Sequence, residues 1–365
     1  MYRRQRTIVL IFCVLVPALV AVCLLAVEIG AVRVNPLSLF RLLAKALGLS
    51  AGPLPGTEEK AILLYIRLPR VVAAMLVGAA LSLGGVVMQG LFRNPMASPD
   101  ILGVSTGGSL GAVLAISTGL FAMNVLFLPL LAVCGAMLAA SLIYLISRYK
   151  GRTSLLFVVL AGLAVSSLFN GLVSAILLFA RQYEVSQFIF WTMGGLDGRT
   201  WRQVTLPLPV LLPGMVFLFF FTRDLNLFAL GEEGAHALGM RVEHIKRLLL
   251  AVTAVVTGVA ISISGPVGFV GLLVPHLFRM LVGPDHRVLL PVSALGGALF
   301  LVLCDLIGRT LISPFEIRVG IITAVLGSPY FLYLIVRYQR RGFAGGNPVF
   351  GRGNPVSKNE RSARG

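Results

Sequence analysis

Apolar residues fall into long runs along the chain, and short polar segments separate these runs. A run of about 18 or more apolar residues can cross the ~30 Å hydrocarbon core of a bilayer as a helix. The predicted spans cover residues 8–27, 68–90, 102–119, 124–147, 154–179, 204–222, 247–264, 268–282, 288–307 and 319–337. The pattern therefore predicts an all-α membrane protein with about ten transmembrane helices, in a single polytopic domain over residues 1–340.

The composition agrees with this pattern. Hydrophobic residues make up 57% of the chain, charged residues make up 12%, and the mean hydropathy is +0.93. A soluble domain of 365 residues needs more polar surface than this. The net charge of +17 does not indicate nucleic-acid binding, because the charges lie between the apolar runs and at the two ends rather than on one basic face.

The first apolar run, 8–27, follows Arg3, Arg4 and Arg6, an order that also describes a cleavable signal peptide. The run is long for a signal peptide and no small-x-small cleavage site follows it, so we predict a retained span. Ten spans place both termini on one side. The cytoplasmic assignment puts the larger share of Lys and Arg inside, including the loop 148–152, as the positive-inside rule requires. We predict a multi-pass protein of the cytoplasmic membrane with both termini cytoplasmic.

Two segments are not predicted to span the membrane. Residues 35–49 carry apolar and basic residues on different faces of a helix, which indicates a short helix on the outer surface. Residues 342–365 are rich in Gly, Pro, Arg and Ser, and this composition predicts a disordered cytoplasmic tail.

An internal repeat relates the two halves of the chain. Small residues match at an offset of 180 positions, namely Gly78 with Gly258, Ala80 with Ala260, Ser82 with Ser262 and Gly85 with Gly265. Chance similarity is the alternative, since small residues recur in membrane helices. A real repeat gives two five-helix units, about residues 60–200 and 240–340. An odd number of spans in each unit inverts one unit relative to the other, as in many transporters.

Two motifs carry a family resemblance. The first runs from Gln89 to Ser105 (QGLFRNPMASPDILGVS), and the second runs from Gly265 to His276 (GPVGFVGLLVPH), followed by GPDHR at 283–287. Together they resemble the permease subunits of the iron-siderophore, haem and vitamin B12 ABC importers. The resemblance covers about residues 60–340. It implies a type II importer with two permease copies or paralogues, separate cytoplasmic ATPases and an outer substrate-binding protein.

The resemblance also implies that this chain is a transport subunit without a catalytic site or bound cofactor. The sequence has no G-x-x-x-x-G-K-[ST] loop, so ATP and Mg²⁺ are expected on the partner ATPases.

The resemblance places the ATPase contact in the inner loop 225–247, where the family has two short helices. The matching positions are Leu230, Gly231, Glu232, Glu233, Ala235, Leu238, Gly239 and Met240. The two glutamates favour a helix N-terminus, and Gly239 can adopt the left-handed conformation at the helix end. An ordinary solvated loop is the alternative.

The resemblance places the binding-protein contact on Arg67, Arg70 and Arg309, because arginine pairs bidentately with carboxylates. The alternative is internal: the first two anchor a helix end and Arg309 pairs with Asp305 one turn earlier. Arg318 stands where the family usually has proline. It adds a charge near the docking surface and slightly favours a further contact with an acidic partner.

Ser167, Asn170 and Ser174 share one face of the fifth span. A polar stripe in a membrane helix faces protein or water, so we predict that it lines the translocation pathway. Interhelical hydrogen bonding is the alternative. Trp191, in a segment that resembles the family's outer loop before span six, is expected to anchor at the membrane interface rather than to touch substrate.

Other classes of function fit less well. A secondary transporter usually needs ionisable groups within its spans, and Asp305 is the main candidate here. The four histidines form no HExxH pattern, no catalytic constellation is apparent, and no recurring His, Cys or carboxylate cluster indicates a metal channel. This fits a metal that arrives already chelated. A ferric siderophore is the first expectation for the cargo, with haem and cobalamin open.

Overall fold

The computed structural model describes residues 2–30, 37–46, 48, 56–149, 152–153, 155–312 and 315–344. The first half contains α1 (Tyr2–Glu28), α2 (Leu37–Ala46), α3 (Thr57–Ala61), the π-helix η1 (Ile62–Arg67), α4 (Leu68–Leu91), the 3-10 helix η2 (Pro99–Leu102), α5 (Val104–Ser117), α6 (Leu120–Met123), α7 (Phe127–Ser147), β1 (Arg148–Tyr149), β2 (Arg152–Thr153) and α8 (Leu155–Phe179). The second half contains α9 (Gln182–Thr192), α10 (Trp201–Thr205), α11 (Leu208–Phe219), α12 (Thr222–Phe228), α13 (Glu232–Ala237), α14 (Val242–Ser264), α15 (Val270–Val282), α16 (His286–Thr310) and α17 (Val319–Ala344).

The ten predicted spans are present. Eight helical stretches in the described part of the chain are long and apolar enough to cross a membrane. The other two spans correspond to α5 and α15, which have 14 and 13 residues and are therefore only about 20 Å long. The sixth span is broken near Pro207 into α10 and α11, because proline cannot donate the backbone hydrogen bond of a continuous helix. The fold is all-α apart from the β1–β2 hairpin.

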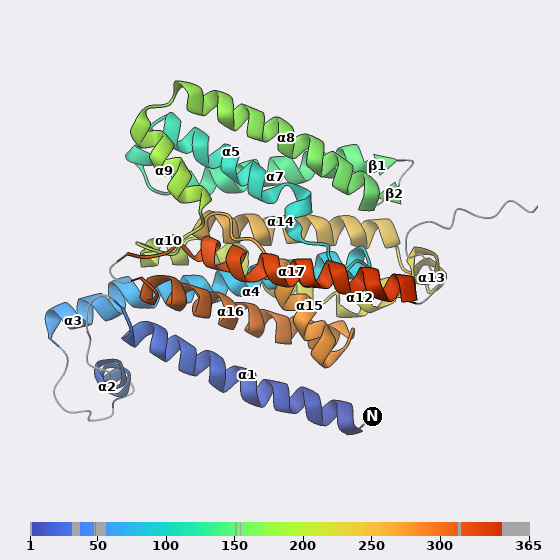
Figure 1. The fold of residues 1–365 in the computed structure, drawn as a ribbon, viewed down its shortest axis with the longest axis horizontal. Coiled ribbons are helices and arrows are strands. Elements are labelled where there is room, and N and C mark those ends of the chain that lie inside the picture. Colours follow the sequence, from blue (N-terminus) through green and yellow to red (C-terminus); the bar gives the residue numbers. More distant parts are fainter. Residues whose placement is uncertain are drawn as a thin grey trace, which may run out of the picture.

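The arrangement of the helices supports the inverted repeat. Helices α4 and α14 lie at the centre, α5, α7 and α8 lie on one side, and α1 and α16 lie on the other (Figure 1). Helix α4 packs against α16 much as α14 packs against α7, and each short helix packs against the next long one, α5 on α7 and α15 on α16. The two five-helix units therefore exchange equivalent contacts across the α4–α14 pair.

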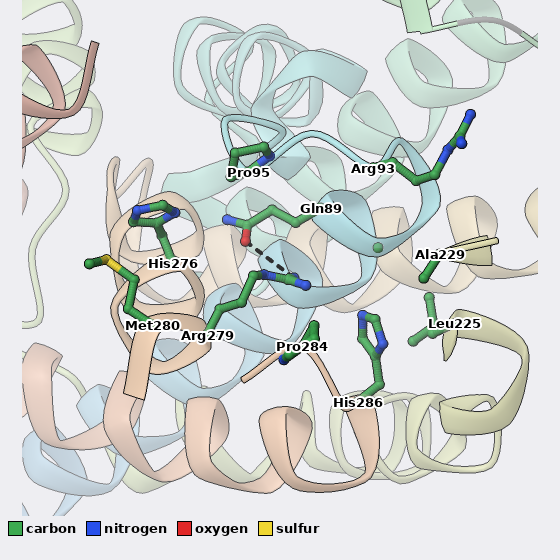
Figure 2. Close-up of a pocket in the computed structure, with 11 residues that line it drawn as sticks. Gln89, Arg93, Pro95, Leu225, Ala229, His276, Arg279, Met280, Pro284 and His286 are labelled. Carbon is green, nitrogen blue, oxygen red and sulfur yellow. Dashed lines mark hydrogen bonds between the residues drawn. The ribbon is translucent and has the colours of Figure 1, made fainter. Parts of the chain in front are cut away.

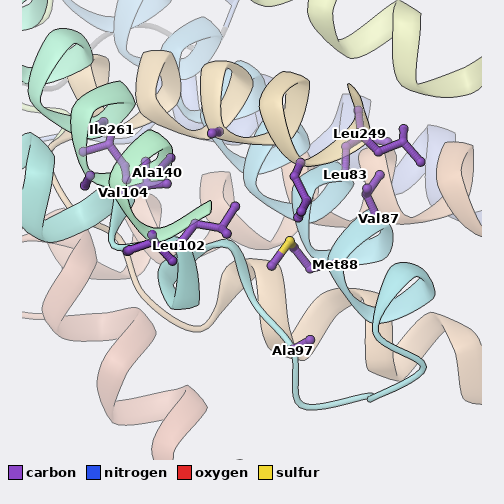
Figure 3. Packing of buried hydrophobic residues seen from close by; sticks show 14 of the residues in the cluster. Leu83, Val87, Met88, Ala97, Leu102, Val104, Ala140, Leu249 and Ile261 are labelled. Atoms are coloured by element: carbon purple, nitrogen blue, oxygen red, sulfur yellow. The ribbon is translucent and has the colours of Figure 1, made fainter. Parts of the chain in front are cut away.

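Burial identifies the core and the lipid-facing helices. In the most apolar stretch of α3–η1–α4, 78% of residues are buried, whereas in the most apolar stretch of α1 only 11% are. Leu83 and Val87 of α4 are fully buried and pack near Leu249 of α14 (Figure 3). The exposed apolar side chains of α1 are expected to face lipid, since the bilayer core is itself apolar.

Glycine allows the central helices to approach closely. A Cβ on Gly85 of α4 would overlap the backbone carbonyl oxygen of Gly271 in α15, and one on Gly78 would overlap that of Gly297 in α16. Small residues at such crossings let backbones touch, which is the usual way that membrane helices pack.

The two segments predicted not to span have different outcomes. Residues 37–46 of the predicted surface helix 35–49 form α2, and Ser38 Oγ of α2 donates to Glu59 Oε1 of α3 at 2.8 Å. The predicted tail, 342–365, lies outside the described residues beyond Ala344.

Candidate functional site

The loop between α11 and α14 folds into two short helices, α12 and α13, as the family resemblance implies. Helix α13 begins at Glu232, with Glu233 also in its first turn, where a carboxylate is favourable near the partly positive helix end. It ends in a Schellman motif, in which the backbone N–H of Met240 donates to the Ala235 carbonyl and that of Gly239 donates to His236. Gly239 has φ +84°, the left-handed conformation predicted for it.

Helix α13 is fixed on one side and open on the other. Ala235 is fully buried and Met240 is 7% exposed, whereas Leu230 and Leu238, which flank the helix, are 62% and 63% exposed. Lys246 of α14 is buried and its Nζ lies 2.7 Å from Glu232 Oε1. The result is a short helix attached to α14 that presents two apolar side chains outward, as a protein contact surface does.

Helix α12 is joined to the start of α16 through Asn226. The Oδ1 atom of Asn226 accepts from the backbone N–H of His286 at 2.9 Å and lies 2.8 Å from His286 Nδ1. Its Nδ2 donates to Asp285 Oδ1 at 2.9 Å. Sequence reasoning missed this joint, because its partners lie 59 and 60 residues apart and no local motif indicates the pairing.

A cavity of about 340 Å³ lies beside this joint, between the end of α4, α12, α15 and the start of α16 (Figure 2). Its lining residues are Gln89, Gly90, Arg93, Pro95, Leu225, Ala229, His276, Arg279, Met280, Pro284 and His286. Arg279 Nη2 lies 3.5 Å from Gln89 Oε1, and Gln89 Nε2 donates to the Leu272 carbonyl at 3.1 Å. The cavity therefore adjoins the α12–α13 loop and leaves space next to α12.

The opposite end of the bundle, which we call the α10 end, contains the three arginines that were predicted to meet a binding protein. Arg67 is 5% exposed and its Nη1 donates to the carbonyls of Val27, at 2.8 Å, and Glu28, at the end of α1. Arg309 is also 5% exposed and donates to the Ala26 carbonyl. Both side chains therefore satisfy carbonyls that the end of α1 would otherwise leave without partners.

Asp305 lies between two of these arginines. Arg70 Nε is 3.0 Å from Asp305 Oδ1 and 3.1 Å from Oδ2, and Arg70 Nη1 is 2.8 Å from Glu316 Oε2. Arg309 Nε lies 3.8 Å from Asp305 Oδ2, so the predicted pairing of Arg309 with Asp305 is present. The docking role remains a prediction, and Arg70, with its side chain 11% exposed, is the most accessible of the three.

Arg318 also has a partner within the chain. Its Nη1 lies 3.0 Å from Asp197 Oδ1, and its guanidinium carbon is 5.0 Å from the centre of the Phe190 ring. The neighbouring Arg199 is partly buried, and desolvation lowers the pKa of its guanidinium, although the Asp197 carboxylate opposes that shift. Arg70, Glu316, Arg318 and Asp197 line a small depression between α4 and the loops before α10 and α17.

The polar stripe of α8 lies on an exposed face. Ser167, Asn170 and Ser174 are all exposed in the single chain, and Ser174 Oγ donates to the Asn170 carbonyl at 2.9 Å. Among the described residues, the side chains of the stripe make no hydrogen bond to another helix, so the stripe is available to water or to a second protein chain.

The structure corrects the expectation for Trp191. Its side chain is 7% exposed and it stacks on Phe188 with ring centres 6.5 Å apart. The segment after it is held inside the protein: Gly195 N–H donates to the Ser264 carbonyl at 2.7 Å, and Gly320 N–H donates to Gly194. Trp191 is thus a packing residue, and the prediction that it anchors at the membrane interface was wrong.

Among the described residues, no group of three or more His, Cys, Asp or Glu could hold a metal ion.

The comparison with known families decides to which family the chain belongs. The pattern of the FecCD transport family matches residues 18–337. The chain belongs to the FecCD transport family. It is therefore a multi-pass permease subunit, a transport protein rather than an enzyme.

Relatives in this family carry different substrate names. The chain is 47% identical over 270 residues to the cobalamin import permease BtuC of Halobacterium salinarum, covering 74% of this chain and 72% of that one. It is 41% identical to the hemin permease HmuU of Yersinia pestis (77% and 84% covered) and 42% identical to the Fe(3+) dicitrate permease FecD of Escherichia coli (78% and 88% covered).

A solved structure shares the fold. It is described as an inward-facing metal-chelate type ABC transporter and superposes with a TM-score of 0.77 at 32% identity, covering 90% of this chain and 99% of that one.

Proposed function

We propose that this chain forms the membrane pathway of an ATP-driven importer of a metal chelate in the cytoplasmic membrane, with both termini cytoplasmic. The observation that carries the proposal is α13. It is a short helix with a capped C-terminal end, flanked by exposed Leu230 and Leu238, and it lies in the loop that the family resemblance assigns to the ATPase contact. A separate ATPase subunit binding there supplies the free energy of transport, with ATP and Mg²⁺ held by that subunit.

The α10 end is the side that receives a soluble substrate-binding protein. Arg70 and Arg318 are the partly accessible cations in the depression there, and Glu316 and Asp197 neutralise them in the isolated chain. An acidic partner binds by replacing these internal carboxylates, because arginine forms paired hydrogen bonds with any carboxylate of suitable geometry. Arg67 and Arg309 support this surface from beneath by fixing α1.

The pathway lies along the exposed stripe of α8. Ser167, Asn170 and Ser174 have no protein cover in the single chain, and polar side chains at membrane depth need protein or water. A second permease chain, identical or a paralogue, facing this one across the stripe encloses a polar route for the chelate.

The cargo is a metal chelate rather than a free ion. A ferric siderophore is the first candidate from the sequence. Cobalamin is the second, and a specific observation favours it: the relative with 47% identity is named for cobalamin import, while those named for hemin and ferric dicitrate are 41% and 42% identical.

Uptake in a strain lacking this chain tests the proposal. Labelled ferric siderophore, cobalamin and haem are supplied separately, with and without the wild-type chain and with a Leu230→Glu/Leu238→Glu variant. We expect one cargo to require the wild-type chain, and we expect the double variant, whose changed side chains are already exposed, to reach the membrane normally but fail to restore uptake. Unchanged uptake of all three cargoes without the chain would overturn the assignment of substrate class.

A further inference from the structure

Asn226 of α12 is hydrogen-bonded to the start of α16 through both atoms of its side-chain amide. Its Oδ1 can only accept, so the His286 ring donates from Nδ1, and the same oxygen accepts the His286 backbone N–H. Its Nδ2 donates to Asp285. Asp285 in turn caps α16, since its Oδ1 accepts from the backbone N–H of Arg287 at 3.1 Å. One side chain on α12 thus fixes the first turn of α16 by three hydrogen bonds.

The joint is buried and borders the cavity. His286 is 2% exposed, and Leu225 and Phe228 of α12 are 0% and 1% exposed. Leu225, Ala229 and His286 all line the 340 Å³ cavity, which leaves space for α12 and the start of α16 to shift together. A displacement of α12 can therefore carry the start of α16 with it instead of being absorbed by a flexible loop.

Helix α16 leads from this joint to the α10 end. Its 25 residues span about 37 Å, and its far end carries Asp305 and Arg309, which contact Arg70 and the end of α1. It also packs along α4, the most buried of the long helices. The joint thus lies at one end of a continuous helix whose other end contacts the predicted docking surface.

A separate contact attaches α13 to α14. Lys246 of α14 pairs with Glu232 at 2.7 Å. Because this pair lies apart from the Asn226 contacts, we expect their removal to detach α12 from α16 while α13 keeps its attachment to α14.

We propose that Asn226 is a positioning residue that couples α12 to α16, so that movement imposed on α12–α13 by the ATPase is transmitted along α16 to the α10 end. This inference rests on the proposed function, in which α13 is the ATPase contact. Asn226 touches neither substrate nor nucleotide and acts only through the geometry of the α16 N-terminus.

The test is the number of substrate molecules transported per ATP hydrolysed by the complete complex in proteoliposomes. Asn226→Asp keeps the shape and the acceptor atoms but places a second carboxylate against Asp285. We expect a drop of about fivefold or more in transport per ATP, the lower end of usual coupling strengths, with ATPase binding and hydrolysis retained. A merely structural role would lower both together.

The reciprocal double variant Asn226→Asp/Asp285→Asn is the decisive rescue. The new carboxylate at 226 accepts from His286 and from the amide at 285, which restores the link between α12 and α16. Asp285 Oδ1 accepts from both Asn226 and the Arg287 N–H, so the amide nitrogen that replaces it keeps the first contact and loses the second. We expect the double variant to recover most of the transport per ATP that Asn226→Asp loses. Asn124→Asp is the matched control, because the Asn124 side chain accepts from the nearby Leu126 N–H, and an aspartate can accept the same bond.

The inference would be overturned if Asn226→Asp transported as much substrate per ATP as the wild type. It would also be overturned if the double variant recovered neither the transport per ATP nor the assembly that Asn226→Asp had lost. Failure of the wild-type chain itself to bind an ATPase would instead overturn the proposed function, so the two outcomes are distinct.

Discussion

Asp305 is enclosed by Arg70 and Arg309 at the α10 end of α16, and its side chain is 3% exposed. A buried carboxylate is costly to desolvate, and here two guanidinium groups offset that cost. Glu316 binds the same Arg70 but is 41% exposed, so water already solvates it. The two carboxylates therefore differ in burial while sharing a partner.

This difference predicts unequal effects of removing the two charges. Asp305→Asn should destabilise the protein by about 3–5 kcal/mol, because it leaves buried arginine charge without its partner. Glu316→Gln should cost less than about 1 kcal/mol, as exposed ion pairs do. Thermal unfolding midpoints of the purified variants, read by size-exclusion chromatography after heating, compare the two. Equal shifts would show that burial does not set the strength of this cluster.

Single residues also show where sequence reasoning stops. The Asp305–Arg309 pair was predictable because the two residues lie one helical turn apart. The Arg70–Asp305 contact joins residues 235 positions apart, and the Asn226 contacts join residues about 60 apart. Such pairs depend on how helices pack, which hydrophobic patterning does not specify. The sequence therefore could not distinguish an arginine that binds a carboxylate of its own chain from one that binds a carboxylate of another protein.

At the scale of elements, α13 depends on the end formed by Gly239. A β-branched residue is strained at φ +84°, whereas asparagine tolerates this conformation. Gly239→Val should cost about 1–3 kcal/mol locally and weaken ATPase binding, and Gly239→Asn should retain it. Co-purification of the ATPase with each variant measures the effect. Equal recovery with both variants would mean that the capped end does not contribute to the contact.

The crossing of α4 and α15 gives a second prediction at this scale. Gly85→Ala places a methyl group on the carbonyl of Gly271. Because the overlapped atom belongs to the backbone, only a shift of one helix backbone can relieve the clash. Overpacking of this kind costs about 1–3 kcal/mol or more, and the folded yield should fall.

The control for this crossing is Gly171→Ala, because no atom lies within 4 Å of the added methyl group on α8. Alanine is also the better helix former, so this variant should be neutral or slightly stabilising. Monodisperse protein recovered from membranes gives the comparison, and a normal yield of Gly85→Ala would contradict the close crossing.

The elements themselves were largely predictable. Hydrophobic run length located all ten spans, because a membrane helix must be apolar over most of its length. Their limits were less predictable: α5 and α15 are shorter than a full crossing, and prolines divide the sixth span. The burial of Trp191 was missed because tryptophan suits both a membrane interface and a protein core.

For the whole molecule, the internal repeat and the packing agree. Two inverted five-helix units meet along α4 and α14, and both central helices reach the end that carries α12 and α13 (Figure 1). One polar joint connects that end to α14 and another connects it to α16. The architecture therefore suits a protein in which events at one membrane face are passed to the other through whole helices.

The central claim is that transport through this chain is driven by ATP hydrolysis on a separate subunit. The most direct test is uptake of a labelled chelate into proteoliposomes that contain the purified chain, with and without its ATPase, its binding protein and ATP, and with proton or sodium gradients applied separately. We predict uptake only with the ATPase and ATP present, unaffected by collapsing either gradient. Uptake by the chain alone, driven by a gradient and independent of ATP, would contradict the account.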